Sequence, residues 1–359
     1  MNLLQVREKL KNLNREKIYK YCITKKYKYK YKKVNSFWVN IIDASKEGWI
    51  LSKFAEEMKK SLELLGVKVT ITDKFEKDAS INHYVIYYDI HDTVNEKTTF
   101  MITHVECMEK IALIKHYISQ GATGICMSKE VMDKLVLNGV PRNKICYINP
   151  AHDDVIKPKK FIIGITHRVY TNDFRKRDSM IIDVCKNLDH DFFALKIMGS
   201  GWEEIVQELK NLNFDVTYFP EFNKETYNEL IPSLDFFYYD GWDEGNMGYL
   251  DALSAGITSL VTPQGYHLDM GVNTIFCRTV SDFSNELNKY ANNRKIICNS
   301  VKDANWELYT YKHIEIWTYL LKCESLSEIM KNTGFYTDGI HSMFLESISV
   351  TIQHLKSKA

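Results

Sequence analysis

The feature of this sequence that most constrains its fold is a regular alternation of short apolar runs with longer stretches of helical periodicity. Residues 37–43 form the apolar run FWVNIID, and the stretch 50–65 keeps its apolar residues on one helical face. Gly66 ends that stretch, and VKVTITD is the next apolar run. This order is typical of parallel sheets, because a helix carries the chain back to the start of the next strand.

The alternation runs through two successive halves and predicts an α/β fold with two domains. Further strands are expected in the first half at residues 83–90, 98–106, 122–128 and 144–150. In the second half they are expected at residues 159–167, 192–201, 214–220, 235–241 and 257–263. The chain of 359 residues is also longer than one hydrophobic core usually supports. We therefore expect a basic extension at 1–35, an N-terminal domain at 36–155, a C-terminal domain at 156–303, and a terminal helix with a tail at 304–359.

Composition narrows the cellular setting. No run of about 18 apolar residues occurs, so no membrane-spanning helix is expected, and the first residues are too charged for a secretory signal. The eight cysteines are scattered without a Cys-x-x-Cys pair, which disfavours a zinc ribbon or a disulfide framework. These features favour a cytoplasmic protein.

Positive charge is concentrated at the start of the chain. Residues 1–33 hold twelve Lys/Arg against two Glu, although the whole chain has a net charge of only +1. Within this region, tyrosines and lysines interleave over residues 19–33. The segment fits a solvated basic tail or peripheral contact with an anionic membrane, such as the inner face of the plasma membrane. Nucleic acid is not an expected partner, because the acidic remainder of the chain would repel phosphate.

The segment at residues 240–269 carries the chemistry most typical of a ligand site. It combines acidic residues, glycines and the start of a helix in one strand–loop–helix. Gly245 and Gly248 let the backbone approach a ligand, and the free N–H groups of a helix start suit a diphosphate. Asp243 and Asp251 could accept hydrogen bonds from sugar or ribose hydroxyls. On local chemistry alone, Asp243 and Glu244 could equally be caps of the helix.

The same segment resembles the active-site motif of retaining glycosyltransferases of the GT-B fold, related to glycogen synthases and bacterial polysaccharide transferases. That family has two acidic residues separated by seven others in an EG…EA…G frame, and here the frame reads DEGNMGYLDALSAG. The resemblance implies that Asp251 binds the donor ribose and that Asp243 or Glu244 holds the donor sugar. It also places the intervening Gly245, Asn246, Met247 and Gly248 beside the donor.

Other segments from residue 36 to residue 321 match the family in order. The loop with Gly48 resembles the family's first glycine loop, and His104 in THVE resembles a histidine near the donor sugar. GITHRVYTNDFRKR resembles the basic element that reaches the diphosphate, with Arg168 at the first position and Arg175 or Lys176 at the second. Three further matches are the glycine turn at Gly199 and Gly201, the loop with Tyr266 and His267, and a terminal helix at 305–321. The resemblance implies that the glycine turn and this loop contact the donor, although Tyr266 and His267 could instead pack at its rim.

The resemblance implies two Rossmann-like doubly wound domains facing across a cleft, with a C-terminal helix crossing back to the first domain. It implies a glycosyltransferase that moves a sugar from a nucleotide-diphosphate donor to a glycan or lipid-linked acceptor, without cofactor or metal, in surface polysaccharide synthesis. His104, Arg168 and Asp243 or Glu244 would then be catalytic. Because both family glutamates are aspartates here, a non-catalytic GT-B partner subunit stays open. A nucleotide-sugar epimerase is a second alternative.

Overall fold

The structure, a computed structural model, describes residues 38–44, 50–91, 94–153, 155–170, 173, 175–270 and 273–322. The chain divides into two compact units. Unit 1 comprises residues up to 154 together with those from 302 onward, and unit 2 comprises residues 155–301. Among the residues described, no helix has both the length and the apolar character needed to cross a membrane. The basic segment, Gly48 and the tail beyond residue 322 lie outside the described residues.

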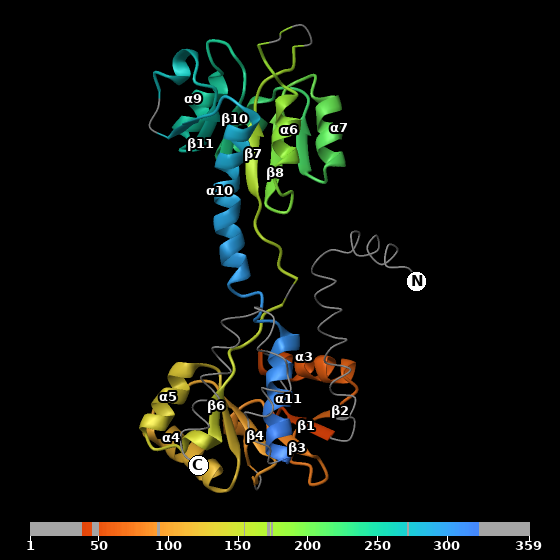
Figure 1. The fold of residues 1–359 in the computed structure, drawn as a ribbon, viewed down its shortest axis with the longest axis vertical. Helices are drawn as coiled ribbons and strands as arrows, with labels where there is room; N and C mark the ends of the chain where they lie inside the picture. The colour runs from red at the N-terminus through yellow and green to blue at the C-terminus, as the bar shows by residue number, and fades with distance from the viewer. Residues whose placement is uncertain are drawn as a thin grey trace. The chain divides into compact units, whose positions relative to one another are not determined.

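Unit 1 is a six-stranded parallel sheet in the order β2-β1-β3-β4-β5-β6, with helices packed against it (Figure 1). The strands are β1 (Trp38–Ile42), β2 (Lys68–Thr72), β3 (Ile81–Tyr84), β4 (Thr98–Ile102), β5 (Thr123–Cys126) and β6 (Ile145–Tyr147). The helices are α3 (Ile50–Leu64), α4 (Met108–Ser119), α5 (Lys129–Leu137) and the short 3-10 turns η2 (Tyr87–Asp89) and η3 (Arg142–Lys144).

The strand expected at residues 83–90 is confirmed only at its first two residues and is wrong from residue 85 onward. The strand β3 ends at Tyr84, and the chain then turns through η2. The apolar residues that suggested a longer strand are instead used in packing, because the Tyr87 ring is buried and its hydroxyl donates to the carbonyl of His104 at 3.1 Å. A continuous apolar run does not by itself distinguish a strand from a buried turn.

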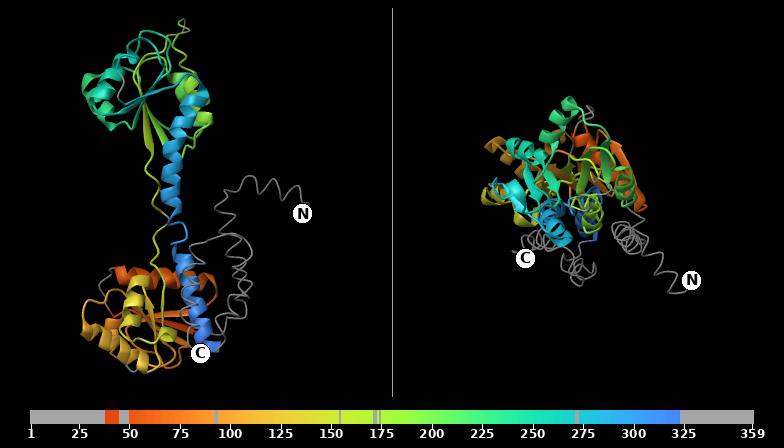
Figure 2. Two further views of the ribbon diagram at one scale, coloured as in Figure 1. Left: turned by 60° about the vertical axis from the view of Figure 1, so that its left-hand side comes forward. Right: turned by 90° about the horizontal axis from the view of Figure 1, so that it is seen from above.

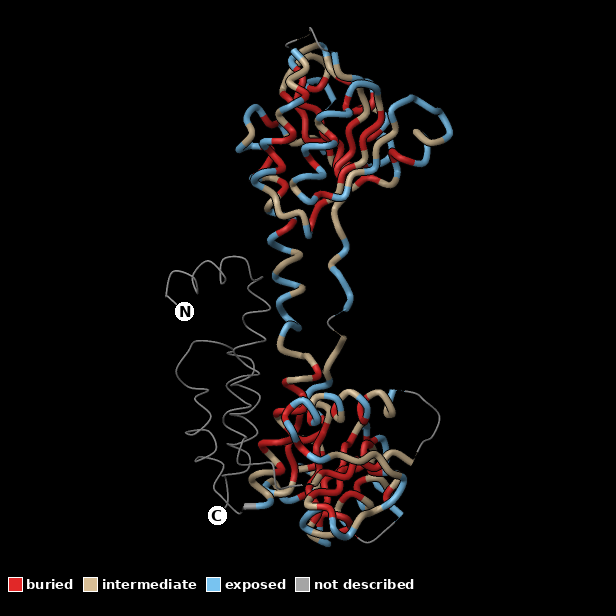
Figure 3. Tube along the Cα trace, turned by 90° about the vertical axis from the view of Figure 1, so that its right-hand side faces the viewer, coloured by how far each residue is buried: buried red, intermediate tan, exposed pale blue. Residues whose placement is uncertain are grey.

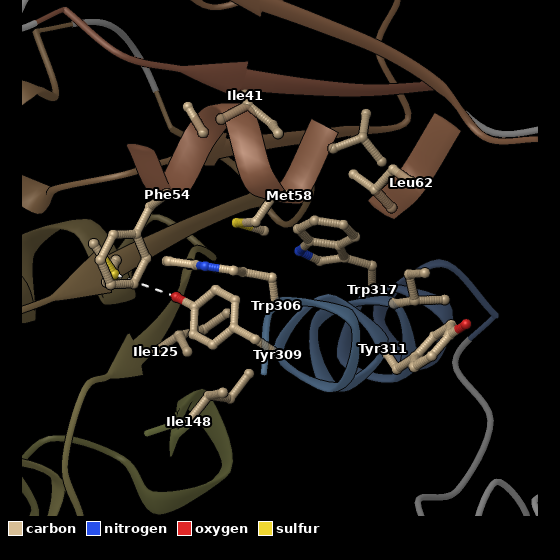
Figure 4. Close-up of a cluster of buried hydrophobic side chains, with 14 of the residues drawn as sticks. Ile41, Phe54, Met58, Leu62, Ile125, Ile148, Trp306, Tyr309, Tyr311 and Trp317 are labelled. Carbon is tan, nitrogen blue, oxygen red and sulfur yellow. Dashed lines mark hydrogen bonds between the residues drawn. The ribbon is translucent and has the colours of Figure 1, made fainter. Parts of the chain in front are cut away.

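The last described helix, α11 (Trp306–Lys322), belongs to unit 1 rather than to unit 2, from which the chain arrives. It packs on α3, where the Phe54 ring meets the edge of Trp306 at 5.0 Å between centroids (Figure 4). Deeper in the unit, the indole nitrogen of Trp317 donates to Thr99 Oγ1 at 3.0 Å. The predicted terminal helix that crosses back to the first domain is therefore confirmed.

Unit 2 is a second six-stranded parallel sheet, in the order β12-β11-β10-β7-β8-β9. Its strands are β7 (Phe161–Ile165), β8 (Phe193–Met198), β9 (Asp215–Phe219), β10 (Phe236–Tyr239), β11 (Thr258–Val261) and β12 (Thr274–Phe276). Its helices are α6 (Met180–Lys186), α7 (Glu203–Asn211), α8 (Lys224–Leu230), α9 (Met247–Ser254) and α10 (Val280–Asn299), with the turns η4 (Ile231–Ser233) and η5 (Gly265–His267). Helices cover the two faces of this sheet (Figure 2).

Two elements of unit 2 were not predicted from the sequence. Strand β12 is only three residues long, too short for a periodic pattern to show. Helix α10 begins at a capping box, in which Thr279 and Asp282 each bond the other's backbone N–H. Its first half packs on the sheet through Phe283, Leu287 and Ala291, and its second half is largely exposed (Figure 3).

Both units thus have the α/β, Rossmann-like architecture that the alternating pattern predicts. In unit 2 the chain forms β7, β8 and β9 in one direction, then returns to place β10 on the other side of β7. In open α/β sheets, ligands bind outside the carboxyl ends of the strands where the order reverses. The loops after β7 and β10 are therefore the first place to look for a site.

Candidate functional site

A cavity of about 610 Å³ lies at the carboxyl ends of β7, β8 and β9 and the start of α9 in unit 2. Its wall is built from four loops that are far apart in sequence. The lining residues are Thr166, His167, Arg168, Met198, Gly199, Ser200, Pro220, Glu221, Phe222, Tyr227, Asn246, Met247, Gly248 and Asp251. The cavity brings together six of the residues predicted for donor binding, namely Arg168, Gly199, Asn246, Met247, Gly248 and Asp251.

Two glycines let the backbone come close to neighbouring loops at this cavity. Gly199 has φ +139°, and a Cβ there would lie 2.2 Å from the carbonyl oxygen of His167. A Cβ on Gly248 would lie 2.3 Å from Thr166 Oγ1. Larger residues at either position would push the loop after β7 away from the wall of the cavity.

Arg168 supplies positive charge to the cavity wall. Its side chain is exposed, and its guanidinium lies 4.3 Å from the centroid of the Tyr170 ring. No ion pair joins Arg168 to a carboxylate among the residues that the structure describes. Arg168 is therefore a cation held by an aromatic face and available to an anion.

Asp251 places a carboxylate in the same lining, on the second turn of α9. The Tyr227 hydroxyl donates to Asp251 Oδ2 at 2.6 Å. Burial of the ring, together with the Asp251 carboxylate, raises the pKa of Tyr227. The phenol therefore stays protonated as a donor and orients one carboxylate oxygen, while the other can accept a ligand hydroxyl.

The start of α9 is capped by Asn246, whose side-chain oxygen accepts from the N–H of Gly248 at 2.8 Å. Asp243 and Glu244 are therefore not the caps of this helix. Asn246 is itself held in place, since its own N–H donates to His267 Nε2 at 3.2 Å.

Asp243 lies outside the cavity lining, in a group of three polar residues beside it. Lys176 Nζ contacts Asp243 Oδ2 and also donates to the Tyr239 hydroxyl at 2.8 Å. The Tyr239 hydroxyl donates to Asp243 Oδ1 at 2.8 Å, and the N–H of Gly245 adds a bond at 3.2 Å. Partial burial opposes ionisation of Asp243, but the bonds from Lys176 and Tyr239 outweigh it and lower the pKa of this carboxyl.

The structure separates the two candidates for the second basic position. Arg175 is exposed and forms a bidentate pair with Asp173, with both N···O distances at 2.8 Å. That pair lowers the pKa of Asp173 to about 2. Lys176 is instead half-buried and contacts Asp243. Of the two acidic candidates, Asp243 is bound in this group, whereas the side chain of Glu244 is exposed and outside the cavity lining.

Tyr266 and His267 support the loops rather than line the cavity. A Cβ on Gly245 would lie 2.6 Å from the Tyr266 ring, so only glycine lets this ring pack there. His267 is fully buried, and its ring bonds the carbonyl of Thr262 at 2.9 Å as well as the N–H of Asn246. A carbonyl needs a donor and an N–H needs an acceptor, so the ring is neutral, in agreement with a pKa lowered by burial.

The sequence did not single out a histidine–carboxylate pair at the end of β7. His167 Nε2 lies 2.7 Å from Asp178 Oδ1, and both side chains are almost fully buried. The His167 ring packs edge-on against Tyr239 at 5.2 Å between centroids, which connects the cavity wall with the group around Asp243. The adjacency of His167 to Arg168 was the only signal available in the sequence.

A buried acid lies directly after β10. Asp240 is fully buried, and the Tyr238 hydroxyl donates to its Oδ2 at 2.9 Å. Burial raises the pKa of Asp240 to about 8, although Tyr238 and the nearby Arg177 oppose the shift. Arg177 also donates from Nε to the backbone carbonyl of Asp240 at 2.8 Å, which joins the loop after β7 to the loop after β10.

The remaining predicted residues are not brought to this cavity. His104 lies in unit 1, is largely exposed, and contacts Glu106 at 2.8 Å. Gly201, with φ +88°, belongs to the turn after β8 and packs on Val169 rather than lining the cavity. Within the described part of the chain, Asp189, His190 and Asp191 are the one group whose spacing could hold a metal ion, and Lys295 already pairs with Asp189 at 2.8 Å.

No protein-family model matches the chain, and no curated protein matches it at a significant level. Similar solved structures include Anabaena HepE in complex with UDP and glucose, which is 11% identical, covers 79% of this chain and 99% of its own, and has a TM-score of 0.31. WaaG, a glycosyltransferase involved in lipopolysaccharide biosynthesis, is 12% identical, covers 84% of this chain and all of its own, and has a TM-score of 0.31. The catalytic domain of cholesterol-α-glucosyltransferase from Helicobacter pylori is 13% identical, covers 45% of this chain and 98% of its own, and has a TM-score of 0.32.

Proposed function

We propose that this chain is a glycosyltransferase that moves a sugar from a nucleotide-diphosphate donor to a glycan or lipid-linked acceptor, with retention and without a metal ion. The observation that carries the proposal is the cavity at the carboxyl edge of the second sheet. It combines the available cation of Arg168, glycines that let the backbone approach a ligand, and the carboxylate of Asp251. These are the groups that a diphosphate and a ribose require.

The proposed reaction breaks the bond between the sugar C1 and the oxygen of the diphosphate. A new bond forms between C1 and the acceptor oxygen, and the acceptor proton passes to the released diphosphate or to solvent. Negative charge grows on the departing phosphate, so cations near it lower the barrier. Arg168 is the first cation proposed for that role, and Lys176 is the second. Asp243 would bond the hydroxyls of the donor sugar.

The acceptor and the setting rest on the sequence. The interleaved tyrosines and lysines at residues 19–33 fit peripheral contact with an anionic membrane, where a lipid-linked acceptor would be found. We propose a cytoplasmic protein that acts at the inner face of the plasma membrane in bacterial surface polysaccharide synthesis.

The decisive experiment is thermal unfolding of the full chain with UDP, GDP, ADP or CMP, each with and without magnesium. A ligand at a hundred times its dissociation constant stabilises by about 2.7 kcal/mol. We expect one nucleoside diphosphate to raise the unfolding temperature without magnesium. A shift that requires magnesium would contradict the metal-independent mechanism.

A matched pair of variants locates the effect. Arg168→Ala should abolish most of the shift and, with the donor so identified, lower turnover about tenfold or more. Lys186→Ala removes an exposed lysine of the same unit, which pairs with Asp183 and lies outside the cavity. This control variant should change neither the shift in unfolding temperature nor turnover. If no nucleotide stabilises the wild type, the proposal fails and a non-catalytic partner subunit becomes the better explanation.

A further inference from the structure

We infer that Tyr239 is a positioning residue, whose hydroxyl holds Lys176 and Asp243 in one geometry and leaves a defined N–H of Lys176 for an anionic ligand. The inference rests on the proposed function for the identity of that ligand. Its first test needs no ligand at all.

The direction of the hydrogen bonds follows from the chemistry of the groups. An ammonium has three N–H donors and no acceptor, so Lys176 must donate to the Tyr239 oxygen at 2.8 Å. The phenol has one hydrogen, and it is given to Asp243 Oδ1 at 2.8 Å. Lys176 also donates directly to Asp243 Oδ2. The three groups therefore form a closed ring of bonds in which each donor is assigned.

This ring of bonds fixes where the remaining donor of Lys176 can point. Among the residues that the structure describes, two of its three N–H groups have a partner, and the side chains of Lys176 and Asp243 are only 15% and 14% exposed. A long lysine side chain normally samples many rotamers, and ordering it costs free energy. Because the ring of bonds orders the Lys176 side chain before a ligand arrives, the free energy of ordering it does not weaken ligand binding.

The position of Tyr239 is itself fixed by the loops around the cavity. Its ring is fully buried and meets the edges of His167 at 5.2 Å and His267 at 5.6 Å. The ring of Tyr170 connects the group to the cavity wall, with Arg168 at 4.3 Å from its centroid and Lys176 at 6.0 Å. The two cations proposed for the diphosphate therefore share one aromatic ring.

The neighbouring residue in the same strand provides a matched control. Tyr238 is as deeply buried as Tyr239, and its hydroxyl likewise donates to an aspartate oxygen, Oδ2 of Asp240, at 2.9 Å. Successive residues of a strand point to opposite faces of the sheet. Tyr238→Phe and Tyr239→Phe thus each remove one buried hydroxyl and its bond to an aspartate, but only Tyr239→Phe removes one of the two hydrogen bonds that hold Lys176.

The test is lysine acetylation of the full chain by a limiting amount of an activated ester, read for each lysine by peptide mass spectrometry. Tyr239→Phe should raise the acetylation rate of Lys176 about fivefold, the size expected for loss of one buried hydrogen bond. Tyr238→Phe should leave Lys176 unchanged, and Lys186 should react equally in all three proteins. Equal acetylation of Lys176 in the wild type and in Tyr239→Phe would overturn the inference.

A second arm of the same experiment separates this inference from the proposed function. UDP, GDP and ADP are added to the wild type at millimolar concentration before acetylation. Selective protection of Lys176 by one of them, weakened in Tyr239→Phe, supports both. No protection by any of the three contradicts the role of Lys176 at a donor diphosphate, whereas the comparison without nucleotide still decides the role of Tyr239.

Discussion

The two units share a six-stranded parallel sheet but differ in where they keep their polar side chains. In unit 1 they are buried within the strands, as with Asn40 in β1, Asn82 and His83 in β3, and Thr99 in β4. In unit 2 the corresponding groups gather after the strands end, at Arg168, Lys176 and Asp243. The same architecture therefore uses polar residues to stabilise one unit and to build a candidate site in the other.

The buried asparagines of β1 and β3 satisfy one another and the groups around them. Asn40 donates to Asn82 Oδ1 at 2.9 Å and accepts from the hydroxyls of Thr70 and Thr72 at 3.0 Å. Asn82 completes the group by donating to the carbonyl of Glu76 at 2.9 Å. Fully satisfied networks of this kind specify a unique packing and leave no donor for a ligand.

Truncating Trp317, at the centre of the packing of α11 on unit 1, should give the largest loss of stability. Trp317 is fully buried against unit 1 and donates to Thr99 Oγ1 at 3.0 Å, so Trp317→Ala should destabilise that unit by about 3–5 kcal/mol. Hydrogen exchange would show the loss in β1 and β4 but not in β7 and β10. Trp202→Ala, at an equally buried tryptophan of unit 2, should show the reverse. A uniform loss of protection in both sheets would contradict the division of the core into two units.

Acidification should weaken unit 1 through two buried histidines. Burial lowers the pKa of His83 well below its usual value and that of His313 to about 4, and the two rings lie 5.1 Å apart with Lys312 also on α11. Groups with lowered pKa must gain protons on unfolding, so this stability is present above pH 6.5 and is lost as the pH falls. The lowered pKa of His313 alone should reduce the free energy of unfolding by about 2 kcal/mol when the pH falls from 7 to 5.

The variant His313→Asn tests that assignment. An asparagine amide can still donate to the Tyr309 carbonyl, which His313 Nδ1 contacts at 2.9 Å, but it does not titrate. The protection of β3 and β4 against hydrogen exchange should therefore fall less between pH 7 and pH 5 in this variant than in the wild type. An unchanged pH dependence would assign the effect to other groups.

Unit 2 should respond to pH in the opposite sense over a higher range. The pKa of Asp240 is raised to about 8 by burial, so the folded state binds a proton that the unfolded state has already lost. The free energy of unfolding then falls as the pH rises, by about 2 kcal/mol between pH 6.5 and pH 8. Asp240→Asn should remove this slope in the exchange of β7 and β10. A slope that survives in Asp240→Asn would assign the pH dependence to other groups.

These features differ in how far the sequence predicts them. The alternation of apolar runs gives both sheets, because strands and helices of this length have distinct periods. The acidic and glycine residues of DEGNMGYLDALSAG likewise predict the loop and helix from which Asn246, Gly248 and Asp251 line the cavity. Periodicity fails where an element is too short, as in β12, or where a buried turn is as apolar as a strand, as at Tyr87.

The details of the site depend on contacts that sequence spacing does not contain. Arg175 and Lys176 are adjacent, and only the fold shows that one pairs with Asp173 and the other with Asp243. Tyr239 is indistinguishable from a core residue of its strand until its hydroxyl is seen between two charged groups. His267 has the chemistry of a ligand contact, yet backbone groups occupy both its nitrogens.

The smallest predicted effect concerns the Asp251 carboxylate, which the Tyr227 hydroxyl orients. Tyr227→Phe removes the 2.6 Å bond to Asp251 but keeps the ring, which packs on Phe222 at 5.4 Å. Because Asp251 is exposed, its bond adds little to stability, and the unfolding temperature should hardly change. Binding of the nucleoside diphosphate should weaken about fivefold, the effect of one hydrogen bond that orients a ligand contact. Calorimetric titration of wild type, Tyr227→Phe and Asp251→Asn measures this. Equal affinity in all three would remove Asp251 from the binding site and would leave Arg168 and the group around Asp243 as the candidate ligand contacts of unit 2.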